Sequence, residues 1–204
     1  MNLNFSDFSA NQRYHLMTQT IIPRPIAWVL TDSSNGSFNL APFSYFTAVS
    51  SAPPILMLSV GKKPNGDNKD TLTNIISNEK MVIHIASEQH ANLVTQTSQT
   101  LAHGESELIN AKLATTDFAN FSLPRLAQCD IAYGCELYEI KELGDVPQSL
   151  IFVEVKQVHI NDKVADIDEK QRIKVHADRI KPLARLGGGE YATIEEPFNI
   201  VRPK

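Results

Sequence analysis

Residues 23–71 decide the fold, and they read PRPIAWVLTDSSNGSFNLAPFSYFTAVSSAPPILMLSVGKKPNGDNKDT. The run 26–31 is short, apolar and rich in residues that favour β-strands. Asn35-Gly36 follows it and is the strongest short-range indicator of a hairpin, before a strand resumes over 38–40. The stretch therefore begins with a predicted β-hairpin.

Two further strands are predicted in the same stretch. Tyr, Phe, Thr and Val dominate residues 44–50, and Pro53-Pro54 ends that run. Residues 55–60 are apolar almost throughout, which is typical of a central strand. A polar loop over 61–68 then leads to a helix, so the stretch predicts a small sheet followed by a helix start.

The rest of the chain adds a few helices before it returns to strands. Apolar residues at helical spacing predict a helix after Asp70, which is a favourable N-cap residue. A second amphipathic helix is predicted to begin at Ser87-Glu88 and to stop at His103-Gly104. The other predicted features are the end of the first helix at Asn78, a strand over 81–86, a short helix over 105–113, and a meander of strands over 131–143 and 150–160.

Many short strands with two or three helices indicate a mainly β fold with added helices. They favour a closed antiparallel barrel over βαβ repeats. The chain has 204 residues and is 42% hydrophobic, which suits a single domain over 1–204. Residues 181–203 are rich in Gly and Pro, so we expect them to dock against the barrel without forming a regular element.

The charge pattern argues against several classes of partner. The formal net charge is −4, and Lys and Arg are dispersed, so no basic segment is available to grip nucleic acid or anionic lipid. No apolar run approaches the about 20 residues that span a bilayer, and residues 1–9 lack the basic start and apolar middle of a signal peptide. We expect a cytoplasmic protein with no nucleic-acid or membrane partner.

Common hydrolytic and metal-binding motifs are absent. The histidines are scattered, with no HExxH, GxSxG or GxGxxG pattern. Cys129 and Cys135 are too few and wrongly spaced for a disulfide framework, a zinc site or a redox pair. No strand leads into the glycine run 187–189 and no GK[ST] follows it, so it is not a P-loop. The sequence predicts no metal site, and it singles out no catalytic residue.

The start of the helix at residue 70 suits an anion. Unpaired N–H groups and the positive end of the helix dipole attract negative charge there. Lys69 precedes Asp70, and the hydroxyls of Thr71 and Thr73 lie in the first turn. A phosphate would fit this arrangement. The plainer interpretation is a helix capped by Asp70 with Lys69 in solvent.

Residues 39–47 offer surfaces suited to a flat aromatic ring. Pro42, Phe43 and two further aromatic residues lie among small polar residues, beside backbone amides and the hydroxyl of Ser44. This combination suits an isoalloxazine or pterin ring. The alternative interpretation is that the aromatic side chains fill the barrel core.

Four stretches together resemble one protein family. They are PRPIAWV (23–29), NLAPFSYFTAVSSAPPILMLSVG (39–61), NKDTLTNI (68–75) and RLGGGEYAT (185–193). In this order they resemble the flavin reductase-like, FMN-binding split-barrel family, which includes flavoredoxin and the reductase components of two-component flavin monooxygenases. The resemblance covers about residues 20–195.

The resemblance implies a six-stranded antiparallel split β-barrel that forms a homodimer, with one FMN per subunit near the interface. It implies that 41–44 lie nearest the ring, that 69–71 receive the phosphate with Arg24 as a further phosphate candidate, and that Arg185 and Tyr191 form a late cover. The full set of implied FMN-binding residues is Arg24, Asn39, Ala41, Pro42, Phe43, Ser44, Thr47, Ser59, Val60, Gly61, Lys69, Asp70, Thr71, Arg185 and Tyr191.

The resemblance also implies a reaction, the transfer of a hydride from NADH or NADPH to FMN. Such a transfer needs oriented rings and little acid–base help, which fits the missing catalytic motifs. An oxygenase or another electron-transfer protein is the implied partner. The alternative is a flavoredoxin-like FMN electron carrier without a nicotinamide site. The related pyridoxamine phosphate oxidase-type barrel ranks last, because its arginine-rich phosphate sites are not seen here.

Overall fold

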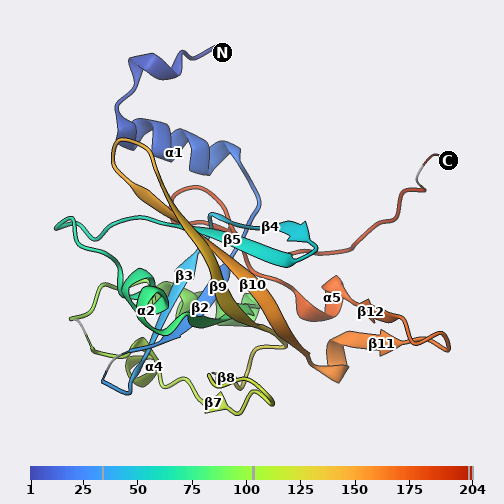
Figure 1. The fold of residues 1–204 in the computed structure, drawn as a ribbon. Helices are drawn as coiled ribbons and strands as arrows, with labels where there is room; N and C mark the ends of the chain where they lie inside the picture. Colours follow the sequence, from blue (N-terminus) through green and yellow to red (C-terminus); the bar gives the residue numbers. More distant parts are fainter. Residues whose placement is uncertain (34, 103, 202, 204) are drawn as a thin grey trace.

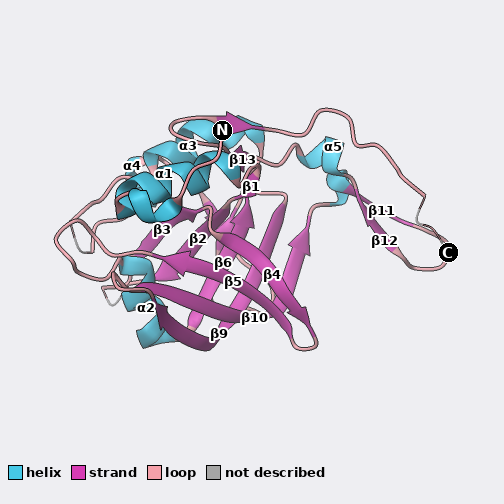
Figure 2. Cartoon of the chain, turned by 90° about the horizontal axis from the view of Figure 1, so that it is seen from above, coloured by secondary structure: helices cyan, strands magenta, loops and turns pink. Residues whose placement is uncertain are grey.

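A seven-stranded antiparallel sheet dominates the computed structural model, which describes residues 1–33, 35–102, 104–201 and 203 (Figure 2). The strand order is β3-β2-β6-β9-β10-β5-β4, and every neighbouring pair runs antiparallel. The strands are β2 (Ala27–Asp32), β3 (Phe38–Phe43), β4 (Phe46–Ser51), β5 (Pro54–Val60), β6 (Lys80–Ile85), β9 (Ile131–Leu143) and β10 (Gln148–Ile160).

The predicted mainly β, antiparallel architecture with added helices is confirmed, whereas the strand count and the closed barrel are not. The sheet has seven strands rather than six, and no ladder joins its edge strands β3 and β4 among the described residues. The chain itself bends from β3 into β4 at Ser44-Tyr45. Ser59 N donates to Tyr45 O at 2.9 Å, which holds this bend against β5. The two edges are therefore linked through the chain and not through hydrogen-bonded strands.

The predicted hairpin and meander are confirmed. β2 and β3 pair from Ala27↔Phe43 to Asp32↔Phe38, and the turn between them contains Gly36 with a φ of 79°. β9 and β10 pair along nearly their whole length. The core consists mainly of two apolar clusters. Successive side chains of β2 point to opposite faces of the sheet, so Trp28 packs in one cluster and Val29 in the other.

The helices differ from prediction in their ends. α2 (Asp70–Asn78) has the predicted length, but Lys69 is the N-cap and Asp70 is the first helical residue. The second predicted helix is shorter, consisting of η2 (Glu88–His90) and α3 (Ala91–Gln96), with Thr97 as its C-cap. Its predicted stop includes His103, which lies outside the described residues. α4 (Glu107–Asn110) is one turn within the predicted 105–113 helix.

Several elements near the two ends of the chain were not predicted. η1 (Phe5–Asp7) and α1 (Ala10–Thr20) precede the sheet, and Ser9 and Gln12 form a capping box at the start of α1. A second, three-stranded sheet joins β1 (Arg24–Pro25) to β13 (Ala184–Arg185) and β14 (Tyr191–Ala192). The late stretch therefore docks as expected, but it does so by forming short strands.

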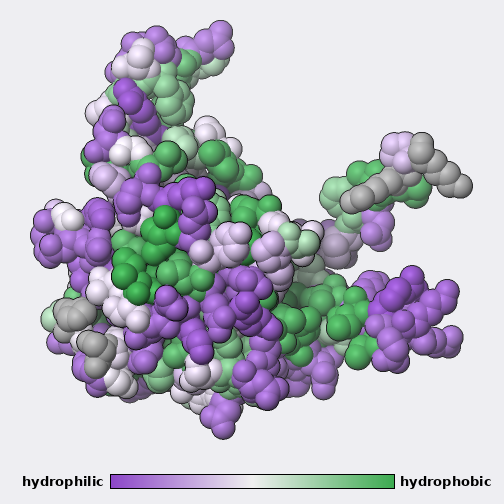
Figure 3. All heavy atoms as spheres, viewed as in Figure 1, coloured by the Kyte–Doolittle hydropathy of each residue, from purple (hydrophilic) through white to green (hydrophobic). Residues whose placement is uncertain are grey.

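Two segments project from one side of the molecule (Figures 1 and 2). The first is the hairpin of β11 (Ala165–Ile167) and β12 (Ile173–Val175), and the second is the C-terminal arm, residues 193–201. Apolar side chains are exposed on both, and Figure 3 shows them on the arm. The remaining elements are β7 (Thr115–Thr116), β8 (Arg125–Leu126), η3 (Asp162–Val164) and α5 (Ala177–Ile180). In the described ranges, no helix is long and apolar enough to cross a membrane.

Candidate functional site

Two hollows meet at Pro42 and Phe43, near the end of β3. The first has a volume of about 100 Å³ and lies between β3, the start of α2 and the segment 97–101. The second has a volume of about 220 Å³ and lies between β3, α1, α3 and β13–β14. Because Pro42, Phe43 and Ser98 line both of them, a ligand that fills one hollow comes next to the other.

Lys69 is a partly buried ammonium group at the N-cap position of α2. It lines the first hollow, and its Nζ lies 5.5 Å from the centroid of the Phe43 ring. Among the described residues, no carboxylate forms an ion pair with Lys69, and burial lowers the pKa of this side chain. A partly desolvated cation in this state gains stability from an anionic ligand.

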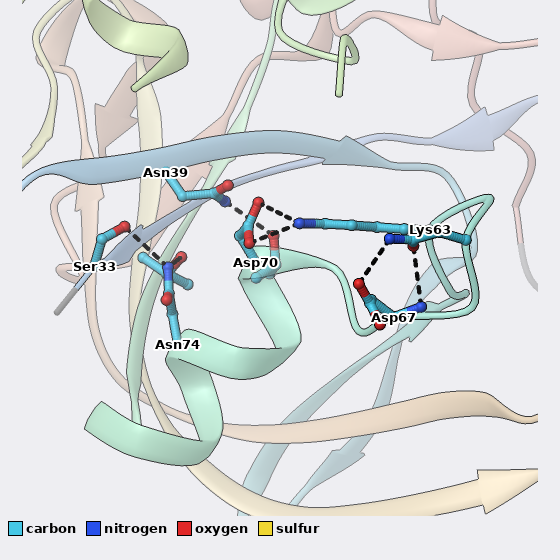
Figure 4. Close-up of polar contacts among 9 residues, drawn as sticks. Ser33, Asn39, Lys63, Asp67, Asp70 and Asn74 are labelled. Carbon is cyan, nitrogen blue, oxygen red and sulfur yellow. Dashed lines mark hydrogen bonds and ion pairs between the residues drawn. The ribbon is translucent and has the colours of Figure 1, made fainter. Parts of the chain in front are cut away.

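The start of α2 adds polar groups to the first hollow and is fixed by buried hydrogen bonds (Figure 4). No side chain caps this helix. Asn39 Nδ2 donates to Thr71 Oγ1 at 3.0 Å, which leaves the hydroxyl proton of Thr71 available to a ligand. Asn74 Nδ2 donates to Thr31 Oγ1 at 3.0 Å and ties the helix to β2. The helix start is thus held rigidly beside β3.

Two buried or partly buried charges that the sequence did not single out complete the first hollow. Lys63 Nζ forms an ion pair with Asp70 at 2.9 Å, so Asp70 anchors the polar loop before α2 (Figure 4). Glu107, only 7% exposed, accepts a hydrogen bond from Leu40 N at 2.9 Å. Burial raises the pKa of Glu107. Both contacts fix backbone around the hollow.

The second hollow carries hydroxyl groups and one guanidinium. Arg185 stacks over the ring of Tyr191, with its Cζ 4.5 Å from the ring centroid, and it donates to Gly188 O. The hydroxyls of Tyr191 and Thr95 lie 2.9 Å apart, which attaches β14 to α3. Tyr14 of α1 also lines this hollow. The late motif therefore does reach the strand predicted to face a ring.

Arg24 lines neither hollow, although it was predicted as a phosphate ligand. It is 5% exposed, and its guanidinium donates to Thr18 O, to Ile21 O at 2.8 Å and to Leu186 O at 2.7 Å. Its Nε also donates to Ser44 Oγ at 3.4 Å. The donors are used by the protein itself, and they tie together α1, the late loop and the ring-facing strand.

Most of the other predicted residues gather at the two hollows. Thr47 is exposed on β4 and donates to Ala48 O, Val60 is in the core, and Gly61 packs near Gln148. The predicted residues that line neither hollow are Arg24, Thr47, Ser59, Val60 and Gly61. Those that line at least one hollow are Asn39, Ala41, Pro42, Phe43, Ser44, Lys69, Asp70, Thr71, Arg185 and Tyr191.

Sequence reasoning missed the segment 97–101 and Tyr14. The run TSQT at 97–100 is rich in hydroxyl and amide groups, which is unusual inside an amphipathic helix and favours a loop. Tyr14 lies on a helix whose capping box, Ser9 with Gln12, was present in the sequence but not used. Both features could have been found from the sequence.

Comparisons with known proteins agree on one family. The family model described as "Flavin reductase like domain" matches residues 17–175. The uncharacterized protein YwrF of Bacillus subtilis is 34% identical over 199 residues, which cover 96% of this chain and 95% of that protein.

Two solved structures share both the fold and part of the sequence. Nitrilotriacetate monooxygenase component B from Bacillus cereus is 33% identical, with a TM-score of 0.88 and coverage of 98% of each chain. The 2-nitrobenzoate 2-nitroreductase NbaA of Pseudomonas fluorescens is 30% identical, with a TM-score of 0.87 and coverage of 100% of this chain and 96% of that chain.

Proposed function

Because the chain belongs to the flavin reductase like domain family, we propose that it binds FMN and reduces it with a hydride from NADH or NADPH. Bound FMN would supply a ring that accepts the hydride. The observation that carries the proposal is the Lys69 ammonium, which is partly buried at a helix start and lacks a carboxylate partner among the described residues. A phosphate has the charge and the acceptor oxygens that this position requires.

The residues of the first hollow fit the phosphate end of FMN. Lys69 would supply charge, and the Thr71 hydroxyl and the first turn of α2 would supply hydrogen-bond donors. Pro42 and Phe43, which border both hollows, would lie along the ring. Asp70 would act indirectly, since its carboxylate holds Lys63 and the loop before the helix.

The lining of the hollows suits a reaction that depends on orientation. Among the described residues, no histidine and no cysteine lines either hollow. Hydride transfer between two stacked rings requires near-attack geometry and a dry contact, and it needs no general base. The rigid attachments of β3 to α2 and to Glu107 support such positioning.

Binding of FMN and riboflavin to the purified protein tests the cofactor assignment. Riboflavin lacks the phosphate, so Lys69→Met should weaken FMN binding about 10- to 100-fold and leave riboflavin binding unchanged. Lys62→Met is the matched control, because Lys62 bonds to Asn68 at 2.6 Å and does not line the hollow. Equal loss of both flavins in Lys69→Met would contradict a phosphate contact.

Anaerobic mixing with NADH or NADPH tests the reaction. We expect the absorbance of bound FMN near its visible maximum to bleach with at least one of the two nucleotides. Comparing their rates then assigns the preferred donor. A protein that retains FMN but is not reduced by either nucleotide is not a reductase.

A flavoredoxin-like electron carrier is the alternative function. It would use the same flavin site, but it would have no site for nicotinamide. Tight FMN retention, together with bleaching only by a reduced partner protein, would support this alternative. The similarity to a monooxygenase component B favours the reductase, with an oxygenase as the partner that receives reduced flavin.

We also propose that two copies of the chain associate. A two-stranded hairpin is marginally stable by itself, yet β11–β12 projects with Ile167 and Ile173 more than 60% exposed. The C-terminal arm projects nearby with Phe198 and Ile200 at least 80% exposed. A second copy of the same chain would cover both segments, and an isologous contact would do so twice.

A further inference from the structure

Glu107 is a buried carboxylate that lines the hollow proposed for the phosphate of FMN. It is only 7% exposed, and it lies at the start of α4, beside the edge of β3. Its Oε2 accepts a hydrogen bond from Leu40 N at 2.9 Å. No other described residue bonds to the carboxylate or forms an ion pair with it. Anchoring β3 therefore uses one oxygen, and the other is available to a ligand.

The charges of the first hollow leave Glu107 opposite only one free cation among the described residues. Four charged side chains line this hollow, and two of them, Lys63 and Asp70, form an ion pair at 2.9 Å. Lys69 and Glu107 are the other two, and they are not paired with each other. β3 and the segment 97–101, which supply further walls, contain no ionisable side chain. With all four groups ionised, the described lining has no net charge before a ligand enters.

Burial already disfavours the ionised form of Glu107. Desolvation is the main reason that its pKa is raised, and the negative charge of Asp70 adds to this effect. The backbone N–H groups of Leu40 and of Glu107 itself act in the opposite direction, as does the charge of Lys63. A further anion in the same hollow would raise the pKa more, because two like charges at close range disfavour each other's ionised form.

A phosphate monoester is such an anion, and it needs hydrogen-bond donors. It carries a charge of about −1.5 to −2 at pH 7. An ionised carboxylate offers no donor to the phosphate oxygens and repels them. A protonated carboxyl group removes this repulsion and supplies an O–H donor. Protonation of Glu107 would therefore satisfy both groups.

We propose that Glu107 is a phosphate-binding residue, which takes up a proton from solvent as FMN binds and then donates a hydrogen bond to a phosphate oxygen. The inference rests on the proposed function, because the phosphate is that of FMN in the first hollow. Its consequence is that FMN binding depends on pH. The affinity falls as the pH rises, by up to about ten-fold per pH unit, whereas the affinity for riboflavin does not change through this group.

Binding of FMN and riboflavin between about pH 6 and about pH 8.5 tests the inference in the parent protein and in Glu107→Gln. Glutamine keeps an acceptor for Leu40 N and has an N–H donor that does not titrate, so it imitates the neutral acid at every pH. At about pH 8.5 we expect the variant to bind FMN about ten-fold more tightly than the parent protein does. Riboflavin should bind equally well to both proteins.

Calorimetry of FMN binding at about pH 8, in two buffers with different protonation enthalpies, measures the proton uptake directly. The parent protein should take up as much as about one proton more than Glu107→Gln. Titration of Lys69 and of the phosphate itself contributes equally in both proteins, so it cancels in the difference. Glu105→Gln is the matched control and should behave as the parent does, since Glu105 is exposed and does not line the hollow.

The outcomes separate the inference from the proposed function. A parent protein that binds FMN no more tightly than riboflavin would contradict the phosphate site itself. If FMN is preferred but proton uptake is the same in the parent and in Glu107→Gln, the inference is overturned while the proposed function stands. Weaker binding of both flavins by Glu107→Gln would also overturn it, because the carboxylate would then serve only to hold β3.

Discussion

Arg24 joins several segments of the chain. Its guanidinium serves three carbonyl oxygens from two distant parts of the chain. Arg24→Met leaves these buried acceptors without donors, so we expect the free energy of unfolding to fall by about 3 kcal/mol. Urea unfolding followed by the fluorescence of Trp28, the only tryptophan, measures the change.

Arg24→Lys is the informative comparison, because it keeps the charge but cannot reach three separate carbonyls with a planar fork. We expect it to recover only part of the lost stability. If Arg24→Met were as stable as the parent protein, the guanidinium would not be holding the segments together.

His84 makes the stability of the protein depend on pH. It is fully buried, its Nδ1 lies 3.0 Å from Trp28 O, and its Nε2 accepts a hydrogen bond from Leu126 N at 2.9 Å. Burial is the main reason that its pKa is lowered to about 4, against about 6.5 in the unfolded chain. Below pH 6.5 the unfolded state therefore binds a proton that the folded state does not.

The free energy of unfolding should accordingly fall as the pH decreases from about 6.5 to about 4, by about 3 kcal/mol from His84 alone. Unfolding by urea at several pH values tests this prediction. Glutamine does not titrate. In the His84→Gln variant, the free energy of unfolding should therefore depend less steeply on pH between about 4 and 6.5, and the difference in slope should correspond to one proton. An unchanged slope would mean that His84 is already protonated in the folded state.

For individual residues, the sequence indicated several side chains that line the candidate site, but it did not indicate which groups the buried side chains bond to. Lys69, Thr71, Phe43 and Arg185 were all expected near a ligand, because their chemistry and local positions suggested it. Arg24 was predicted as a phosphate ligand, but its guanidinium bonds to acceptors that include Leu186 O, 162 positions away in the chain. Contacts over such separations leave no local pattern.

At the scale of elements, α1 depends on its contact with the glycine run. A Cβ atom at Gly187 would lie 3.2 Å from Gln19 Cα and would overlap the Gln19 side chain. We therefore expect Gly187→Ala to push the end of α1 outward and to cost about 1–3 kcal/mol of stability. Hydrogen exchange of the α1 amides should become faster in this variant.

Gly189→Ala is the matched control, because nothing lies within 4 Å of its added Cβ. We expect it to leave both stability and exchange unchanged. Equal effects of the two substitutions would indicate that the loop needs glycine for flexibility rather than for the close approach of α1.

The strands were easier to predict than the helices. Apolar runs bounded by Asn-Gly and Pro-Pro gave β2 and β5 nearly to their ends, whereas β3 was predicted over 38–40 and continues to Phe43. The second helix was predicted too long, because Leu101 continues the apolar spacing although α3 ends at Gln96. α1 is largely exposed and lacks a clear apolar stripe, so only its capping box indicated it.

At the scale of the whole molecule, the proposed dimer depends on the C-terminal arm. Replacing Phe198 and Ile200 by Ser removes two exposed apolar side chains from it. We expect the dimer dissociation constant to rise at least ten-fold, measured by analytical ultracentrifugation. Replacing Glu195 and Glu196 by Gln in the same arm is the control and should leave the constant unchanged.

A parent protein that sediments at the mass of one chain at all concentrations would contradict the dimer. If the parent protein is a dimer and the Ser variant has the same dimer dissociation constant, the arm does not lie in the interface. The β11–β12 hairpin is then the next segment to test. Unfolding midpoints of a dimer should also rise with protein concentration.

The arrangement of the whole sheet could be predicted only in part. The order of strands in the hairpin and meander follows from neighbouring segments. Other pairings join segments that are distant in the sequence: β6 pairs with both β2 and β9, and β10 pairs with β5. These pairings bring seven strands into one sheet. The bend at Ser44-Tyr45 determines whether the edge strands β3 and β4 can pair with each other. The pattern of apolar and polar residues does not predict this bend.

The bond between Arg24 and Leu186 has a consequence for synthesis on the ribosome. All seven strands of the large sheet are complete by Ile160, so the sheet can form while the end of the chain is still being translated. Arg185 and Tyr191, which form one wall of the second hollow, and Leu186, which accepts a bond from Arg24, are translated later than these strands. A chain whose translation stops between Ile160 and Arg185 would therefore be released with a folded sheet but without the second hollow, and it would bind no ligand there.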